Sequence, residues 1–252
     1  MEKTKNILIS QPKTGNHIIY GELEKKFGVN IDFHPFFSIE QISSKEFRTQ
    51  RINVLDYTAL VFSSRHAIDA FFNICAEMRI KVPESMKYFC TTEAIAMYLQ
   101  KHIVYRKRKI FFGDGTQASI MSLIGTKHAG EKFLITTSAS SKSDTLTSLF
   151  ESKGLDFKKG VFVRNVSTDL SGIDLSGYDL IVLYNPSDLK SLYENFPEFN
   201  QGSIKFITFG KGIVEAMDNA GLTIEIKAPT AGAPSAAKAI EMYLENEKQG
   251  LQ

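Results

Sequence analysis

The 252-residue sequence contains only two cysteines, Cys75 and Cys90, and no long apolar run. The cysteines form no CxxC pair and each lies in an apolar stretch, so we expect two buried, reduced thiols. No stretch reaches the ~18 apolar residues that a membrane span requires, so we expect no membrane partner. The first ten residues, MEKTKNILIS, lack the apolar core and cleavage site of a signal peptide. These absences predict a cytoplasmic protein.

A strong charge of one sign is also missing. Lys and Arg total 30 and Asp and Glu total 28, which leaves a net charge of +2. A protein that coats nucleic acid needs a broad basic field, so we expect no nucleic-acid partner. Hydrophobic residues make up 43% and charged residues 23% of the chain, and this balance excludes disordered and collagen-like proteins. The length suits two domains of ordinary size or one large domain.

The sequence lacks the common motifs of metal, nucleotide and acyl-transfer chemistry. HExxH, GxxxxGK[ST] and GxSxG do not occur, and the five histidines are scattered, so we expect no metal site. Residues 113–118 read GxGxxA after an apolar run, but the next predicted strand ends in Thr136-Thr137-Ser138. A dinucleotide site needs an acidic residue there. We therefore favour a tight turn at 113–118 and rank a nucleotide-dependent protein last among the alternatives.

Short apolar runs alternate along the chain with helical patterns. Leu60-Val61-Phe62 is followed by Ser63-Ser64, which are good N-cap residues, and then by apolar residues at helical spacing up to Met78. Leu180–Leu183 is followed in the same way by Pro186-Ser187 and a helix that ends before Pro197. Continuous apolar strands that alternate with amphipathic helices indicate an α/β fold with parallel sheets covered by helices on both faces.

Four of these patterned segments occur twice, in the same order. The pairs are Lys5–Ser10 with Lys132–Thr137, Tyr57–Phe62 with Tyr178–Leu183, Met86–Phe89 with Ile204–Ile207, and the turn at 113–116 with the turn at 229–234. The spacing of about 120 residues is too long for a solenoid and indicates two related α/β domains. Two polar stretches outside this pattern, 38–56 and 165–177, are interpreted as connections between the domains.

Hydroxyl residues gather where predicted strands run into helices. Each can be a simple N-cap, but together they occupy the carboxyl ends of parallel strands, where open α/β sheets bind ligands. Helix N-termini add free N–H groups and a positive dipole end, so a carboxylate-rich ligand would suit this edge. The candidates are Ser10, Ser63, Ser64, Thr91, Thr92, Thr137, Ser138 and Ser187. The basic run Tyr105–Lys109 has two interpretations, a charged edge strand that resists aggregation or a field that attracts a polyanionic substrate.

Several longer segments carry a resemblance to a known family. They are ILISQP at 7–12, LVFSSRHAIDAFF at 60–72, MKYFC at 86–90, YLQKHIVYRKRKIFFG at 98–113, SLYENFPEFNQ at 191–201, and APT and APS at 228–230 and 233–235. On these segments the chain resembles uroporphyrinogen-III synthases, especially forms from the Bacteroidetes lineage. The resemblance spans almost the whole chain.

The resemblance implies two flavodoxin-like domains joined by a two-stranded connector. One domain would hold residues 1–37 and 168–252, and the other residues 38–167. The implied substrate is hydroxymethylbilane, a linear tetrapyrrole polycarboxylate. The implied reaction eliminates water, forms an azafulvene, attacks ring D at its substituted carbon and closes the macrocycle through a spiro intermediate, which inverts ring D. It uses no cofactor or metal. The sequence shows no heptads or long exposed apolar face, so we expect a monomer.

The sequence departs from the family pattern at several expected site positions. The family often has a tyrosine where Val163 stands, and its hydroxyl-bearing turn is replaced by Gly210-Lys211-Gly212-Ile213. We hypothesise that Tyr184 supplies the missing phenol as catalytic residue, and that Lys211 and Gly212 belong to the substrate-binding set. Arg65, beside Ser63-Ser64, favours an anionic ligand in either case. The alternative is a catalytically weakened or inactive protein that binds tetrapyrroles or other organic anions.

Overall fold

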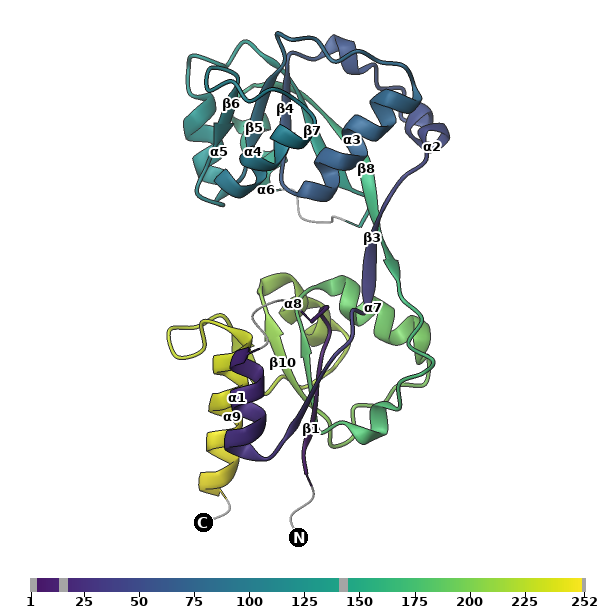
Figure 1. Cartoon of the computed structure of the whole chain (residues 1–252), viewed down its shortest axis with the longest axis vertical. Coiled ribbons are helices and arrows are strands. Elements are labelled where there is room, and N and C mark those ends of the chain that lie inside the picture. Colours follow the sequence, from purple (N-terminus) through teal and green to yellow (C-terminus); the bar gives the residue numbers. More distant parts are fainter. Residues whose placement is uncertain (1–3, 14–17, 141–144, 251–252) are drawn as a thin grey trace. The chain divides into compact units, whose positions relative to one another are not determined.

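The computed structural model describes residues 4–13, 18–140 and 145–250. The chain forms two compact units (Figure 1): unit 1 comprises Met1–Ser38 with Val166–Gln252, and unit 2 comprises Ile39–Asn165. The chain leaves unit 1 within strand β3 (Phe37–Gln41) and returns within strand β8 (Asp156–Ser167). These two strands are neighbours in one sheet, so the connection between the units is two-stranded.

Unit 1 is built on a five-stranded parallel sheet of order β11-β10-β9-β1-β2. Its strands are β1 (Asn6–Ile9), β2 (Asn30–Phe33), β9 (Leu180–Leu183), β10 (Lys205–Phe209) and β11 (Ile226–Ala228). The order 2-1-3-4-5 is that of flavodoxin-like folds. The central strands are apolar throughout because both faces of the sheet are covered.

Helices cover both faces of this sheet. They are α1 (Ile18–Phe27), α7 (Pro186–Asn195), α8 (Lys211–Asn219) and α9 (Ala236–Gly250), and a short 3-10 turn, η3, spans Leu175–Gly177. Successive strand residues point to opposite faces. Ile7 and Ile9 therefore join the cluster that contains residues of α1 and α9, whereas Leu8 joins the cluster under α7 and α8. Figure 1 shows α1 beside α9.

Unit 2 has a six-stranded sheet of order β3-β8-β7-β4-β5-β6, in which β8 to β6 are parallel. The remaining strands are β4 (Ala59–Phe62), β5 (Lys87–Cys90), β6 (Ile110–Phe112) and β7 (Lys132–Ser138). The helical segments are α2 (Ser44–Thr49), α3 (Arg65–Glu77), α4 (Glu93–Tyr98), α5 (Gln117–Ile124) and α6 (Thr145–Ser152), with 3-10 turns η1 (Val54–Asp56) and η2 (Leu99–Lys101).

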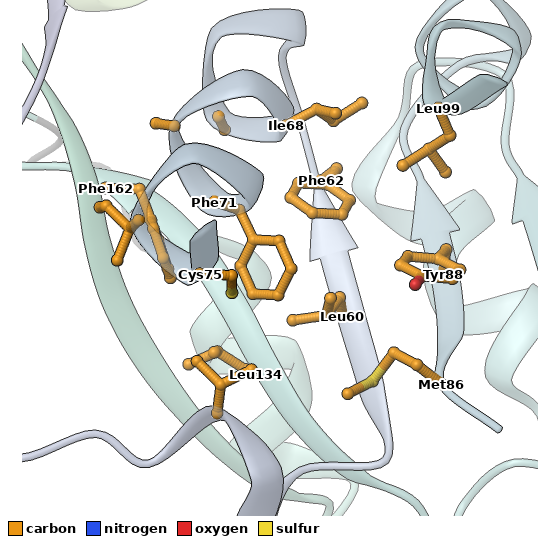
Figure 2. Packing of buried hydrophobic residues seen from close by; sticks show 14 of the residues in the cluster. Leu60, Phe62, Ile68, Phe71, Cys75, Met86, Tyr88, Leu99, Leu134 and Phe162 are labelled. Carbon is orange, nitrogen blue, oxygen red and sulfur yellow. The ribbon is translucent and has the colours of Figure 1, made fainter. Parts of the chain in front are cut away.

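Aromatic side chains fill the main core of unit 2. Figure 2 shows Phe71 of α3 packed between Phe62 of β4 and Phe162 of β8. Its ring centroid lies 5.7 Å from that of Phe62 and 5.5 Å from that of Phe162. Removing such a buried ring typically costs about 3–5 kcal/mol, so this cluster fixes α3 on the sheet. A separate cluster under α5 and α6 covers the other face.

The two parallel sheets repeat one strand order. Strands β2-β1-β9-β10-β11 of unit 1 correspond to β8-β7-β4-β5-β6 of unit 2. The predicted sequence pairs therefore occupy equal places, because β1 matches β7, β9 matches β4 and β10 matches β5. The predicted α/β class with parallel, helix-covered sheets is confirmed. Each unit combines a β-α-β segment with a three-stranded segment that lies elsewhere in the chain.

Three details of the sequence interpretation need comment. The edge-strand interpretation of Tyr105–Lys109 is wrong, because this run forms a loop and turn closed by a hydrogen bond from Lys109 N to Arg106 O, before β6 begins at Ile110. Stretch 38–56 is only partly a connection, since α2 anchors the buried Phe47 in unit 2. Both cysteines are buried and free, as expected. None of the described helices could cross a membrane.

Candidate active site

The carboxyl ends of β1 and β9 lie side by side in unit 1. Ser10 follows β1 directly, and its N–H donates to the Val182 carbonyl of β9 at 3.1 Å. The helix after β1 covers one face of the sheet and the helix after β9 covers the other. Open α/β sheets bind ligands at such a switch point. The residues after these two strands are therefore the first place to seek a functional site.

A buried carboxyl group lies at this switch point. Asp188 is fully buried, and its Oδ2 accepts hydrogen bonds from Tyr184 N at 2.7 Å and from Asn185 N at 3.0 Å. The Ser10 hydroxyl lies beside the carboxyl group, but Ser10 Oγ and Asp188 Oδ1 make no hydrogen bond of ordinary geometry. Burial raises the pKa of Asp188, and the two backbone donors and Ser10 counteract it only in part. Perturbed acids of this kind cluster at functional sites.

Two tyrosines lie near one another at this strand end. Tyr184 follows β9 directly, Tyr20 lies in the first turn of α1, and each hydroxyl group perturbs the pKa of the other. The Tyr184 ring stacks on Phe209 with centroids 5.3 Å apart, and the Tyr20 ring meets Phe33 edge-on at 5.0 Å. Burial is the main cause that raises the pKa of both phenols, and the pKa of Tyr184 rises well above its ordinary range. Both phenols therefore keep their protons at neutral pH.

The next strand end offers a cation and an open helix terminus. Lys211 is exposed at the start of α8 and has no hydrogen-bond or ion-pair partner among the described residues. The N-cap of α8 is Gly210, with φ 105°, and no side chain caps the helix. Gly212 lies near Pro186, because a Cβ at residue 212 would be 3.6 Å from Pro186 Cγ. A helix N-terminus beside a free ammonium group is suited to a carboxylate. Ser187, in the first turn of α7, is half-buried.

The corresponding edge of unit 2 is lined by hydroxyl groups. Ser64 caps α3 by accepting from Ala67 N at 3.1 Å, and Thr92 caps α4 by accepting from Ile95 N at 3.4 Å. The N-cap interpretation therefore holds for these two residues. Ser63 and Thr91 have no side-chain partner within the part of the chain that the structure describes, so their hydroxyl groups are available to a ligand.

The remaining unit 2 candidates lie on β7 and α3. Thr137 and Ser138 are half-buried at the end of β7, and Ser138 Oγ accepts from Ser140 N at 3.3 Å. Arg65 is exposed, with its guanidinium 5.4 Å from the centre of the Tyr98 ring. The Tyr98 hydroxyl in turn donates to Asp69 Oδ2 at 2.7 Å.

Asp69 organises the surroundings of Arg65. Its Oδ1 contacts Lys101 Nζ at 3.0 Å and His102 Nε2 at 2.7 Å, and the His102 ring stacks on Phe72 at 4.6 Å. Partial burial acts to raise the pKa of Asp69, but hydrogen bonds from Tyr98, His102 and Lys101 outweigh it and hold the pKa at about 2. Asp69 is therefore ionised at any physiological pH, and it fixes the aromatic platform under Arg65.

The turn at 113–118 is occupied by its own side chains. Asp114 Oδ1 accepts from Thr116 N at 2.8 Å and from Thr116 Oγ1 at 2.6 Å, while Thr116 caps α5 through Ser119 N. Gly115 has φ 98°, a conformation that favours glycine. A carboxylate already lies at the N-terminus of α5, where a dinucleotide would place its pyrophosphate. The geometry is that of a tight turn.

The structure thus places the predicted residues on two strand edges. Unit 1 brings together Ser10, Tyr184, Ser187, Lys211 and Gly212, and unit 2 brings together Ser63, Ser64, Arg65, Thr91, Thr92, Thr137 and Ser138. Val163, at the family's tyrosine position, is buried in the core, and the Arg164 guanidinium pairs with Glu46 at 2.7 Å.

Sequence reasoning missed Asp188 and Tyr20. Asp188 could have been found, because it follows Asn185 by three residues in the spacing of a capping box, with an acid at the third helical position. No local signal marks Tyr20, since Tyr184, which perturbs its pKa, lies in the other half of the chain.

Comparisons with known proteins agree with this fold. No curated protein sequence matches the chain. A structure of uroporphyrinogen III synthase from the extremely thermophilic bacterium Thermus thermophilus, a triple mutant, superposes with a TM-score of 0.56 at 12% identity and covers 98% of this chain and 100% of its own. A structure of uroporphyrinogen-III synthetase from Helicobacter pylori gives 0.58 at 16% identity, with 96% and 100% covered. At such low identity these likenesses show the fold.

The family model provides the sequence-level match. The model described as uroporphyrinogen-III synthase HemD matches residues 20–238, which is most of the chain. That span includes all the strand-edge residues described above except Ser10. The chain belongs to the uroporphyrinogen-III synthase HemD family.

Proposed function

We propose that this protein converts hydroxymethylbilane to uroporphyrinogen III by cyclising dehydration with inversion of ring D. The observation that carries the proposal is the family match over residues 20–238. The two strand edges supply what such a reaction needs, namely donors for carboxylates and protonated groups for the departing hydroxyl. The reaction eliminates water and forms carbon–carbon bonds without net oxidation, so its chemistry calls for no redox cofactor.

The substrate-binding set recognises a polycarboxylate. In unit 1, Lys211 contributes an ammonium group that has no partner among the described residues, and the uncapped start of α8 at Gly212 contributes backbone N–H donors. In unit 2, Arg65 contributes a guanidinium, and the hydroxyl groups of Ser63 and Thr91 contribute further donors. Ser10, Ser64, Thr92, Thr137, Ser138 and Ser187 complete the proposed set. Many moderate donors can hold a flexible linear substrate in the conformation that closes.

Acid catalysis comes from Tyr184 of unit 1. A hydroxyl group is a poor leaving group, and a positioned acid that protonates it typically contributes about 10²–10⁴-fold. The buried Val163 side chain has no proton to give, whereas Tyr184 lies at a strand end and is protonated at neutral pH. Tyr184 therefore belongs to the proposed catalytic group. We further propose that the protein acts as a monomer in the cytoplasm.

A second candidate is a catalytically weakened protein that binds tetrapyrroles or other organic anions. It is favoured by Val163, by the loss of both hydroxyl groups at Gly212 and Ile213, and by the fact that Ile213 is buried. Both candidates share the anion-binding edges. They differ in whether Tyr184 transfers a proton to the departing hydroxyl group.

A coupled assay separates these candidates. The purified protein receives the linear bilane made in situ, and the oxidised products are separated into porphyrin isomers. Predominant type III isomer supports the synthase. Formation of the spontaneous type I isomer alone rejects it, and a binding titration with the tetrapyrrole then tests the second candidate.

A further inference from the structure

A cavity of about 210 Å³ lies within unit 2, at the amino ends of β5 and β6. Residues of the loops before these two strands line it, together with Tyr88 and Ile110, which pair in register near the strand starts. The residues proposed to bind the substrate, such as Thr91, follow the carboxyl ends of the same parallel strands. The cavity therefore lies at the opposite edge of the sheet from the candidate active site.

Tyr88 forms the inner wall of this cavity. The residue is only 4% exposed, and its ring stacks on that of Phe62 with centroids 6.4 Å apart (Figure 2). Its hydroxyl group has no hydrogen-bond partner among the described residues. The hydroxyl oxygen is not sealed from the surface, so the cavity that Tyr88 lines gives access to it. A nearly buried hydroxyl group without a partner costs free energy, which a ligand that bonds to it would recover.

The side walls of the cavity are apolar. They are formed by Val82, Pro83, Ile103, Val104 and Ile110. Val104 is 78% exposed, so a ligand that covered it would remove apolar surface from water. A water molecule occupies about 30 Å³ in the liquid, so the cavity has room for about seven waters, or for one aromatic ring with a substituent at each end. A linear tetrapyrrole with its four rings does not fit.

The rim of the cavity is charged. Two cations, Arg106 and Lys109, and one anion, Glu84, line it, which leaves one positive charge. Arg106 Nη1 donates to the Glu84 carboxylate at 3.1 Å, but that side chain is 84% exposed and the ion pair is weak in water. Lys109 Nζ donates to the Glu84 carbonyl oxygen. Guanidinium and ammonium groups have five and three N–H donors, so both cations keep donors for a single carboxylate.

We propose that this cavity binds a small aromatic monocarboxylate that carries a hydroxyl group opposite its carboxylate. The ring lies between the apolar walls, the carboxylate contacts Arg106 and Lys109, and the hydroxyl group reaches Tyr88. The site is independent of the proposed function, because it lies in unit 2 alone and excludes the tetrapyrrole by size. It assigns a ligand to two residues of the basic run, whereas Lys107 and Arg108 do not line the cavity.

The test uses 4-hydroxybenzoate as the probe and the full chain as the protein. A ten-atom ligand of ordinary efficiency should bind with a Kd of about 1 mM or tighter, measured by calorimetry. Amide NMR shifts should centre on residues 82–88 and 103–110. Benzoate, which lacks the hydroxyl group, and 4-hydroxybenzyl alcohol, which lacks the charge, should each bind about fivefold more weakly.

Two variants assign the contacts. Tyr88→Phe keeps the stacked ring, so it should weaken 4-hydroxybenzoate about fivefold and leave benzoate unchanged. Arg106→Gln should weaken both carboxylates about fivefold and leave the alcohol unchanged. Lys107→Gln is the matched control, because it removes the same charge from a neighbouring exposed residue that does not line the cavity. Arg106 is exposed, so its variant tests the site even if Tyr88→Phe folds poorly.

Three results would overturn the inference. They are no saturable binding at ten times the expected Kd, equal weakening by Arg106→Gln and Lys107→Gln, and equal weakening of both carboxylates by Tyr88→Phe. A probe that binds at the strand edges instead would lose affinity in Arg65→Ala or Lys211→Ala, which rejects the cavity site and leaves the proposed function standing. Conversely, formation of type I isomer alone rejects the proposed function and leaves the cavity site standing.

Discussion

The two sheets share a strand order but differ at their carboxyl edges. Aligned by the internal repeat, Tyr184 stands in unit 1 where Ser63 stands in unit 2, and Asp188 stands where Ala67 stands. Asn185 and Ser64 match as well, and both cap the helix that follows. The capping role is thus kept in both copies, while the residues around it have diverged. Unit 2 carries small hydroxyl groups here, and unit 1 carries a phenol, Tyr184, and a buried carboxyl group, Asp188, whose pKa values are both raised by burial.

The next strand end repeats this contrast. Phe209 and Gly210 of unit 1 match Thr91 and Thr92 of unit 2, so one copy has an aromatic wall and an uncapped helix where the other has two hydroxyl groups and a capped helix. Under the proposed function, unit 2 would hold substrate carboxylates through these hydroxyl groups, and unit 1 would hold them through Lys211 and the uncapped start of α8.

The largest expected effect comes from replacing Asp188 by alanine. The N–H groups of Tyr184 and Asn185 would lose their acceptor in a buried place, which should lower the free energy of unfolding by about 2–4 kcal/mol. Asp188→Asn keeps one acceptor oxygen and should cost less than about 1 kcal/mol. Urea unfolding measures both. Equal losses in the two variants would mean that the negative charge, and not the acceptor, stabilises the turn.

The second prediction compares the cations of the two edges. Arg65→Ala and Lys211→Ala should each raise KM for the bilane about tenfold with little change in kcat, because each removes a charge-assisted contact with a substrate carboxylate. The effects should shrink at high salt. Lys153→Ala is the control, since this exposed residue follows α6 at the opposite end of the sheet. If only one variant raises KM, only that unit binds carboxylates.

How much of this structure can be predicted from the sequence depends on whether a feature is decided by neighbouring residues or by contacts between distant segments. Leu180–Leu183 and Ala59–Phe62 are apolar on both faces, so their strand character and buried position could be read locally. The conformation of the basic run at 105–109 could not be predicted locally, because it follows from the turn that leads into β6. The proximity of Tyr20 to Tyr184 depends on the pairing of β1 with β9, a contact between distant segments that no local pattern encodes.

The third prediction concerns stability at acidic pH. Burial shifts the pKa of one buried group in unit 1 and of one in unit 2 in opposite directions. Burial lowers the pKa of His128 in unit 2 below its ordinary 6.5 and raises that of Asp188 in unit 1 above 3.8. As pH falls below 6.5, His128 takes up a proton in the unfolded chain before it does so in the folded protein. The free energy of unfolding therefore decreases until the pH reaches the lower pKa that His128 has in the folded protein. Asp188 changes stability in the opposite direction. Its contribution to the free energy of unfolding is present at low pH and is lost as pH rises through its raised pKa.

Replacing His128 by phenylalanine should therefore reduce the loss of stability on acidification. The His128 ring packs against Phe89 and Phe111 at 5.5 and 4.7 Å, and its Nδ1 has no partner among the described residues, so the new ring can keep the packing. Lys87, Lys127 and Glu131 are the charged groups around it. Urea unfolding at about pH 7.5 and about pH 5.5, on either side of the ordinary histidine pKa, should show a smaller drop than in the unaltered protein. The exposed His66→Gln should leave the drop unchanged; an equal drop in both variants would remove His128 from the acid response.

The smallest expected effect tests whether the open helix end of unit 1 serves the ligand. Gly212→Ala adds a Cβ at ordinary contact distance from Pro186 and improves helix propensity, so the free energy of unfolding should rise by about 0.5 kcal/mol. Gly21→Ala in α1, where a Cβ meets nothing within 4 Å, measures that propensity gain alone. If a substrate carboxylate approaches the N–H groups of α8, the methyl group obstructs it and KM should rise about two- to threefold. A stabilised Gly212→Ala protein with unchanged KM would leave the Lys211 side chain as the carboxylate contact at this strand end, and unit 1 would then bind through a flexible charge while unit 2 binds through fixed hydroxyl groups.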